Sequence, residues 1–442
     1  MKVIGSIRWI YVMALLMAGQ RVAAQSHEEA DGGGPGTEIS VAANAISKNA
    51  IFDDAAKYIF EIKNPTANNQ QGKVSYTVVG QDGEKLKSDS ITVSVSAKST
   101  GKYNFDIKAS GPGFYKVNFM VNITDYDDTL HKAFGVQPEK LTSDHKKPDD
   151  FDDFWQKAKN ELSDVEPQFQ CIRMPSMCTP TCNVYLVQMQ SLGNITIRGW
   201  LTEPVTKNLN KKFSVILCLP GYQIALSPIM TVGDPDVAFL TLNVRGQGNS
   251  REFINTRHDE FVIHHIDNKN KYVMRGVVMD CIRAMDFIFS RSELKHDNVF
   301  VKGGSMGGFL AMATASLDKR VSLCSAQSPI FADVRSLIKR VTFPITSINM
   351  YLKTQPGLTL DKILDNLDYF DVKNFAPNIK CKFLMSIGLL DTYVPPANDY
   401  TVYNSMTTTN KKIMVFRDYG HDVSPLYINL ENAWMHDQFG LY

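Results

Sequence analysis

The sequence carries almost no net charge and has no strongly basic region. Its 442 residues include 47 lysines and arginines against 46 aspartates and glutamates. The basic residues do not form a stripe interleaved with aromatic residues, which is the pattern expected of a nucleic-acid-binding surface. The composition therefore argues against a nucleic-acid partner, and a neutral substrate suits this charge balance better.

The sequence also lacks a hydrophobic run long enough to cross a membrane. The apolar stretch Trp9–Met17 has about ten residues, whereas a membrane-spanning helix needs about 20. Lys2 and Arg8 precede this stretch, and Val22-Ala23-Ala24 supplies the small residues of a cleavage site, as in a secretory signal peptide. We therefore predict a signal peptide over residues 1–24 with cleavage after Ala24, and an exported protein, periplasmic or secreted, that has no membrane anchor.

Cysteines are few, and their number is odd, which is unusual for an exported protein. Three of the seven lie together in a Pro-rich polar segment, where a disulfide between two would leave the third free. No histidine is spaced with them as in a zinc site, so the sequence implies neither a metal nor an organic cofactor. These three cysteines are Cys171, Cys178 and Cys182.

The first third of the chain has the alternating pattern of β-strands. Between residues 46 and 138 apolar residues alternate with polar ones, as in Tyr103-Asn104-Phe105-Asp106-Ile107, and short turns interrupt the pattern. This pattern predicts an all-β, immunoglobulin-like sandwich, preceded by a flexible linker over residues 25–45. Two roles remain open for the sandwich: a spacer that packs against the rest, or a carbohydrate-binding module with aromatic residues that stack on sugars.

From residue 148 onward, short apolar strands alternate with helical patterns. A helix is expected over residues 150–162, and a longer one over Tyr272–Phe289 separates two of the strands. Residues 148–442 are therefore predicted to form an α/β domain, in which helices cover both faces of a mostly parallel sheet. The strand candidates are residues 184–189, 195–201, 213–219, 238–244, 299–303, 321–326, 383–387 and 412–416.

One pentapeptide in this domain places a serine between a strand and a helix. It is Gly303-Gly304-Ser305-Met306-Gly307, a G-x-S-x-G pattern preceded by β-branched residues and followed by residues that favour helix. Such a turn holds the serine in a strained backbone conformation, and it needs glycines because the following helix passes close by. Ser305 is therefore the candidate nucleophile.

A catalytic serine needs a base, and the base needs an acid that orients it. Asp391 and His421 each follow a predicted strand, in the order nucleophile, acid, histidine that is typical of an α/β-hydrolase. Since parallel strands end at one edge of a sheet, we predict a catalytic triad of Ser305, Asp391 and His421. Other roles stay open from the sequence: Asp391 can cap the next helix, and His421 can be a surface residue.

Two backbone N–H groups are candidates for an oxyanion hole. The first belongs to Met306, the residue after the nucleophile, and the second to Tyr222, in the loop after an earlier strand. We expect the ring of Tyr222 to line the pocket, although a packing role would also explain this residue.

Six motifs follow one another through residues 148–442, about two thirds of the chain. They are Asp150-Phe151-Asp152-Asp153-Phe154-Trp155, Gly221-Tyr222, Asn243-Val244-Arg245-Gly246-Gln247-Gly248, Gly303-Gly304-Ser305-Met306-Gly307-Gly308, Tyr369-Phe370-Asp371 with Asn374-Phe375-Ala376, and Gly388-Leu389-Leu390-Asp391 with Pro395-Pro396.

In this order the motifs resemble the acetyl xylan esterase and cephalosporin C deacetylase family of α/β-hydrolases, carbohydrate esterase family 7. In that family the Arg-Gly-Gln element is a structural signature beside the active site, which implies supporting roles for Arg245 and Gln247. A simple turn after a strand would also account for its glycines. Two positions depart from the family pattern: Met306 replaces a usual glutamine, and Asp422 replaces a usual glutamate after the histidine.

The resemblance implies a serine esterase that removes O-acetyl groups from plant polysaccharides or their oligosaccharides through an acetyl-enzyme. Its partner would be an acetylated carbohydrate substrate. A broader carboxylesterase or a serine peptidase of the same fold remains an alternative, as does an inactive glycan-binding protein. Homo-oligomerisation also stays open. The resemblance implies compact hexamers for relatives without an N-terminal sandwich, whereas the added sandwich would obstruct such an assembly.

Overall fold

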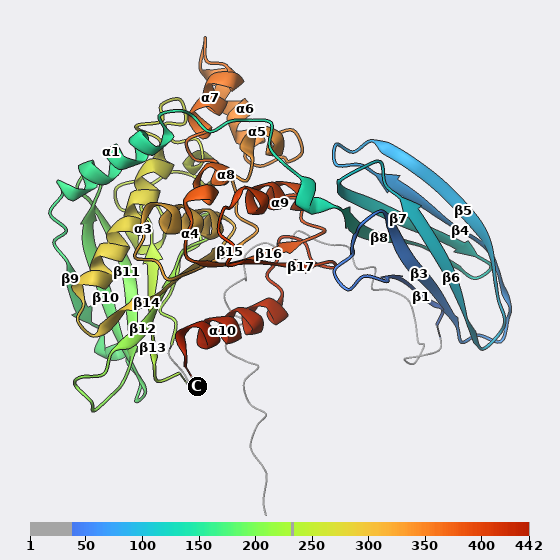
Figure 1. The fold of residues 1–442 in the computed structure, drawn as a ribbon, viewed down its shortest axis with the longest axis horizontal. Coiled ribbons are helices and arrows are strands. Elements are labelled where there is room, and N and C mark those ends of the chain that lie inside the picture. Colours follow the sequence, from blue (N-terminus) through green and yellow to red (C-terminus); the bar gives the residue numbers. More distant parts are fainter. Residues whose placement is uncertain (1–37, 231–233, 442) are drawn as a thin grey trace, which may run out of the picture.

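The computed structural model describes residues 38–230 and 234–441, which form two regions with separate β-sheets (Figure 1). The predicted signal peptide and most of the predicted linker lie outside these residues. Among the helices of the described ranges, none combines the length and the apolar character that a membrane span requires.

The N-terminal region is a β-sandwich, as the alternating pattern predicts. One sheet has the order β1-β3-β6 and the other β2-β8-β7-β4-β5. Phe119 lies at the centre of the core, within 6.2 Å of the ring centroids of four other aromatic residues, which come from both sheets. The strands are β1 (Ser40–Ala45), β2 (Ile51–Phe52), β3 (Ala55–Asn64), β4 (Gln70–Val79), β5 (Lys85–Val95), β6 (Ser99–Lys108), β7 (Gly113–Ile123) and β8 (Tyr126–Val136).

The sandwich begins earlier than expected. Residues 40–45, which the sequence assigned to the linker, form β1 and pair antiparallel with β3. The segment reads Ser-Val-Ala-Ala-Asn-Ala, and its small side chains give almost no alternating hydrophobic signal, so its strand character depends on the pairing with β3.

The second region contains a nine-stranded sheet with the order β17-β16-β15-β14-β12-β13-β11-β10-β9. The six strands β12 to β17 pair in parallel, whereas β9, β10 and β11 are antiparallel to their neighbours. All eight strand candidates are present, and the sequence missed only the short β9. The strands are β9 (Gln170–Arg173), β10 (Cys182–Ser191), β11 (Ile195–Pro204), β12 (Phe213–Cys218), β13 (Val237–Asn243), β14 (Leu294–Gly304), β15 (Leu323–Gln327), β16 (Lys382–Gly388) and β17 (Lys411–Phe416).

Helices cover both faces of this sheet, as predicted (Figure 1). The C-terminal helix α10 packs on one face, and α3, α4, α8 and α9 lie on the other. The central helix α3 is buried almost all round, and its mostly apolar sequence also carries buried charged residues such as Asp280. The helices are α1 (Phe151–Ser163), α2 (His258–Phe261), α3 (Val273–Ser290), α4 (Met306–Leu317), α5 (Val334–Leu337), α6 (Ile345–Thr354), α7 (Leu360–Leu367), α8 (Val372–Phe375), α9 (Pro396–Ser405) and α10 (Pro425–Phe439), with 3-10 turns at Pro138–Lys140, Pro175–Met177, Gly248–Ser250 and Ala376–Asn378.

The cysteines are all free thiols in the structure, so the disulfide considered for the Pro-rich segment is not formed. The thiol of Cys178 points toward the backbone carbonyl of Met174, at 3.3 Å, and Cys182 is buried at the start of β10. Both side chains therefore make contacts within their own segment and do not form a disulfide.

The sandwich contacts the second, α/β region at several points (Figure 1). Lys132 of β8 forms an ion pair with Asp418 at 2.7 Å, and Arg417 donates a hydrogen bond to the carbonyl oxygen of Ala45 at 3.3 Å. Farther along, Phe114 of β7 packs against Tyr400 of α9, with 5.3 Å between ring centroids. The interface combines apolar and ionic contacts and lies beside the segment after β17.

Candidate active site

Ser305 lies at the tip of a sharp turn between β14 and α4. Its backbone has φ 57° and ψ −118°, a combination that a residue with a side chain adopts only at a cost. Two hydrogen bonds hold the turn: Ser305 N–H donates to the carbonyl oxygen of Gln327, and Ile330 N–H donates to the carbonyl oxygen of Ser305. The predicted turn is thus present, and neighbouring strands hold its strained conformation.

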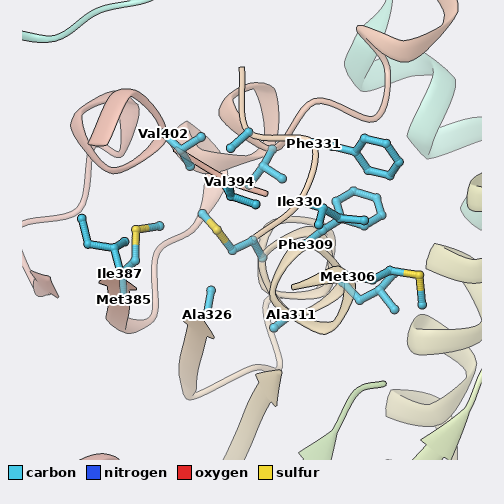
Figure 2. Packing of buried hydrophobic residues seen from close by; sticks show 14 of the residues in the cluster. Met306, Phe309, Ala311, Ala326, Ile330, Phe331, Met385, Ile387, Val394 and Val402 are labelled. Atoms are coloured by element: carbon cyan, nitrogen blue, oxygen red, sulfur yellow. The ribbon is translucent and has the colours of Figure 1, made fainter. Parts of the chain in front are cut away.

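The glycines of the turn are required by close backbone approach. A Cβ atom at Gly303 would lie 2.5 Å from the carbonyl carbon of Gly307, and one at Gly307 would lie 2.4 Å from the carbonyl oxygen of Leu219. Neither backbone neighbour can move aside without displacing the strand or the helix. Figure 2 shows α4 packed among apolar side chains, with Phe309 against Phe331, so the helix behind the serine is firmly seated.

The structure brings Ser305, His421 and Asp391 together in one hydrogen-bonded chain. Nε2 of His421 lies 2.9 Å from Oγ of Ser305, and Nδ1 of the same ring lies 2.7 Å from Oδ2 of Asp391. These distances let the ring accept the serine proton at Nε2 while Nδ1 donates to the carboxylate. The three residues follow β14, β17 and β16 at one edge of the sheet.

Asp391 is held from its other side by the backbone. Its Oδ1 accepts hydrogen bonds from the N–H groups of Tyr393 and Val394, at 2.8 and 2.9 Å, and its side chain is fully buried. Both oxygens of the carboxylate therefore have hydrogen-bond partners within the protein, which fixes its orientation.

A second buried carboxyl lies close to Asp391. Asp399, in α9, has no exposed surface, and among the described residues neither of its oxygens has a hydrogen-bond partner. Burial, together with the nearby charge of Asp391, raises the pKa of Asp399 well above its usual range. Burial therefore disfavours a second negative charge beside Asp391.

His421 is positioned by its own loop and by an aromatic neighbour. The loop approaches the end of β16 so closely that a Cβ atom at Gly388 would lie 2.1 Å from the carbonyl oxygen of Gly420. The ring of Tyr393 packs on the imidazole, with 5.2 Å between centroids. Asp422 is exposed, whereas His436 pairs with Asp234 at 2.8 Å, away from the triad.

The two candidate oxyanion donors lie on either side of the turn. Met306 is the first residue of α4, where a backbone N–H has no acceptor within its own helix. The loop of Tyr222 follows β12, and the N–H of Leu219 donates to the carbonyl oxygen of Lys302 in the nucleophile strand. Both N–H groups belong to segments packed beside Ser305, which is the placement that an oxyanion hole needs.

The side chain of Tyr222 supports its loop. Its hydroxyl donates to the carbonyl oxygen of His258 and accepts from the N–H of Val262 at 3.1 Å, and burial raises its pKa. Phe343, from the segment between α5 and α6, packs on the same ring at 5.1 Å. The ring thus joins the oxyanion loop to two neighbouring segments.

Arg245 and Gln247 lie behind the turn. Arg245 forms a buried ion pair with Asp280 of α3, with the shortest contact at 2.7 Å, and a Cβ atom at Gly276 would collide with its guanidinium. Gln247 is buried and donates to the sulfur of Met306 at 3.8 Å. Since Met306 is itself fully buried, its side chain packs against this support and is not exposed to solvent.

Three features of the site were missing from the sequence predictions. They are the packing of Tyr393 on His421, the buried acid Asp399, and the role of Asp371, whose carboxylate accepts from the N–H groups of Asp333 and Val334. Tyr393 and Asp371 stand within motifs that the sequence did single out, but nothing in a motif shows which neighbour a side chain meets.

Within residues 38–230 and 234–441 no cluster of three or more His, Cys, Asp or Glu side chains is arranged to bind a metal.

The sheet order, the strained serine turn and the hydrogen-bonded histidine and aspartate place the chain among the α/β-hydrolases. Residues 137–437 match the family model described as acetyl xylan esterase (AXE1). The chain therefore belongs to the acetyl xylan esterase family, as its motifs indicated, and is a carboxylic ester hydrolase. The match begins directly after β8, so the sandwich lies outside it.

Individual relatives agree with this assignment. The chain is 29% identical over 315 residues to acetyl esterase Axe7A of Xylanibacter ruminicola, covering 69% of this chain and 70% of that one. It is similar to the acetyl xylan esterase from Paenibacillus sp. R4, with 26% identity, a TM-score of 0.61, and coverage of 68% of this chain and 98% of that one. The fold also matches acetyl xylan esterase 1 from Thermoanaerobacterium sp. JW/SL YS485, with 24% identity, a TM-score of 0.61, and coverage of 69% and 98%.

Proposed function

We propose that this protein is an exported serine esterase that removes O-acetyl groups from plant polysaccharides or their oligosaccharides. The observation that carries the proposal is the chain from Ser305 Oγ through His421 to Asp391, with heavy-atom distances of 2.9 and 2.7 Å, in a member of the acetyl xylan esterase family. The names of the relatives support an acetylated carbohydrate as the substrate.

In the first half of the reaction, Ser305 Oγ attacks the carbonyl carbon of the acetyl group while His421 Nε2 accepts the serine proton. The resulting imidazolium is stabilised by Asp391, and the N–H groups of Met306 and Tyr222 donate to the oxyanion. The tetrahedral intermediate then collapses, the bond to the sugar oxygen breaks, and His421 returns the proton to that oxygen. The products are the free sugar hydroxyl and an acetyl-enzyme.

Water completes the cycle. His421 accepts a proton from a water molecule that attacks the acetyl carbon, which forms a second tetrahedral intermediate. Its bond to Ser305 Oγ then breaks, His421 returns the proton to Oγ, and acetic acid leaves as acetate with loss of its own proton to solvent. Phe343 packs on Tyr222 beside the oxyanion loop, and with this aromatic side chain there we expect a preference for short acyl groups.

The proposal is tested by acetate release from a panel of acetylated glycans, compared with a long-chain ester and a peptide amide. We expect acetate release from acetylated xylo-oligosaccharides and little turnover of the other two, and we expect Ser305→Ala to lose activity on every substrate. Unchanged hydrolysis by Ser305→Ala would refute the mechanism. Faster turnover of the peptide amide or the long-chain ester would replace the proposed substrate class with a peptidase or a general carboxylesterase.

Export is part of the same proposal and rests on the N-terminal sequence pattern. N-terminal sequencing of the protein recovered from the periplasm or the medium is expected to begin at Gln25. A mature protein that retains Met1 would contradict this part and leave the esterase proposal intact.

A further inference from the structure

A cavity of about 340 Å³ lies between the sandwich and the hydrolase region, beside the catalytic loop. Its volume falls within the range of about 300–1,000 Å³ that is usual for ligand pockets. The sandwich provides one wall, and the other is provided by residues 340–342 and the loop between β16 and α9. The sandwich residues that line it are Gly80, Gln81, Phe114, Tyr115, Lys116 and Ala133.

The cavity is connected to the triad through one loop. Asp391 and Tyr393 both line it, and the ring of Tyr393 also packs on the imidazole of His421. Tyr393 is 51% exposed, an unusually open position for a tyrosine that contacts a catalytic base. A ligand in this cavity would therefore lie against the same tyrosine that packs on the general base.

The lining combines aromatic surface with polar side chains. Tyr393 supplies an exposed aromatic ring, and the amide of Gln81, the ammonium of Lys116 and the guanidinium of Arg340 supply hydrogen-bond donors. A sugar ring has this dual character, since its C–H face packs on aromatic rings while its hydroxyl groups exchange hydrogen bonds. An acyl chain would leave these polar groups without partners, which costs free energy.

The wall that the sandwich forms is held in place by a contact across the interface. Asp82, in the turn between β4 and β5, accepts a hydrogen bond at 2.8 Å from Nε of Arg340, whose side chain is only 19% exposed. This contact orders the guanidinium at the cavity before any ligand arrives, which lowers the entropy lost on binding.

We propose that this interdomain cavity is a saccharide subsite, so that the sandwich forms part of the substrate-binding site of the hydrolase. The inference rests on the proposed function for the identity of the ligand: the cavity holds sugar units of the acetylated glycan beyond the acetylated one. A small acetyl ester does not reach it.

Kinetics on two substrates test the subsite. Gln81→Ala and Lys116→Ala are compared with Lys102→Ala, a control on β6 of the other sheet, using 4-nitrophenyl acetate and an acetylated xylo-oligosaccharide. We expect each subsite variant to lower kcat/KM for the oligosaccharide relative to the small ester by about tenfold, through KM, whereas the control leaves this ratio unchanged. An unchanged ratio in the subsite variants, or an equal fall on both substrates, would overturn the proposal.

A binding measurement separates this inference from the proposed function. Titration of Ser305→Ala with unacetylated xylo-oligosaccharides by calorimetry needs no turnover. We expect saturable binding that is weakened in Ser305→Ala/Lys116→Ala and retained in Ser305→Ala/Lys102→Ala. Binding with this pattern supports the subsite even if the wild type releases no acetate from glycans. Absence of binding overturns the subsite even if the wild type releases acetate from glycans.

Discussion

The sandwich and the hydrolase region have cores of different character. Among the described residues, the buried polar side chains of the sandwich are Asn64 and Gln70, and neither is ionisable. The hydrolase region buries many ionisable residues, including Arg245 with Asp280, Glu203, and the acids Asp391 and Asp399. The hydrolase core therefore contains groups whose energy depends on their partners, whereas the sandwich core depends on apolar packing.

This difference follows from what each region positions. A catalytic chain needs charges at fixed places, and burial fixes them only where hydrogen bonds or neutralisation compensate for lost hydration. The sandwich has polar groups that matter for the inferred subsite, but they lie at its surface, where a substitution leaves the core unchanged. Substitutions of charged residues should accordingly have large effects on catalysis or stability in the hydrolase region and small effects on stability in the sandwich.

The largest effect is expected at the triad. Asp391→Asn keeps the size of the side chain but removes the charge that stabilises the imidazolium, and it favours the wrong histidine tautomer, so kcat should fall by about 10³–10⁴-fold. Hydrolysis of 4-nitrophenyl acetate measures the fall, with thermal unfolding as the control for folding. A loss below about tenfold would show that Asp391 does not orient the base.

Next comes the ion pair behind the serine turn. Arg245→Met leaves the fully buried Asp280 without its partner, which should destabilise the hydrolase region by about 3–5 kcal/mol. Urea unfolding followed by tryptophan fluorescence reports this region, because Trp155, Trp200 and Trp434 all lie in it.

A double variant sharpens this test. Arg245→Met/Asp280→Leu replaces both charges by apolar groups and should recover much of the lost stability, since no unpaired charge remains. If the double variant is less stable than Arg245→Met, the loss of stability in Arg245→Met comes from altered packing and not from the unpaired charge of Asp280.

A smaller effect is expected from Glu203, and it depends on pH. Burial, with the charge of Glu293 beside it, raises the pKa of Glu203 to about 7 from an ordinary value near 4.5. The folded protein thus binds an additional proton between these values, so the contribution of Glu203 to stability is complete below pH 4.5 and is lost as pH rises through 7. Glu203→Gln should be more stable than wild type by about 2 kcal/mol at pH 7.5 and nearly equal to it at pH 4. Urea midpoints at both pH values measure this, and a difference independent of pH would contradict the assignment.

The smallest effect is expected at a surface ion pair of the sandwich. Lys102 lies 3.2 Å from Glu61, and the two side chains are 65% and 36% exposed. Lys102→Ala should change the free energy of unfolding by less than about 0.5 kcal/mol, because water screens the pair. Far-UV circular dichroism during urea unfolding follows the strands, and a loss above about 2 kcal/mol would remove the contrast between the two regions.

The sequence was sufficient for the sheet and for the residues that face one another in the triad. Ser305 is marked by glycines that the turn requires, and Asp391 and His421 are marked by their places after strands, which a parallel sheet brings to one edge. These signals are local or follow from topology. They also held for the eight strand candidates, whose apolar runs are strong.

The remaining features arise from contacts between distant segments. Arg245 meets Asp280 across 35 residues, and Asp82 meets Arg340 across 258, without any local pattern that links the partners. Asp399 reads as an ordinary acidic residue at the start of a helix, and only the surrounding burial raises its pKa. The Ala-rich β1 was missed for the same reason, since β3 and not its own sequence determines its conformation.

The attachment of the sandwich to the segment after β17 has a consequence for heat inactivation. Asp418 is bound by Lys132, and Arg417 by the carbonyl of Ala45, only a few residues before His421. If the sandwich melts first, this tether is released and the general base loses its fixed position while the nine-stranded sheet is still intact. Activity would then disappear at the melting temperature of the sandwich, at which tryptophan fluorescence still reports a folded hydrolase.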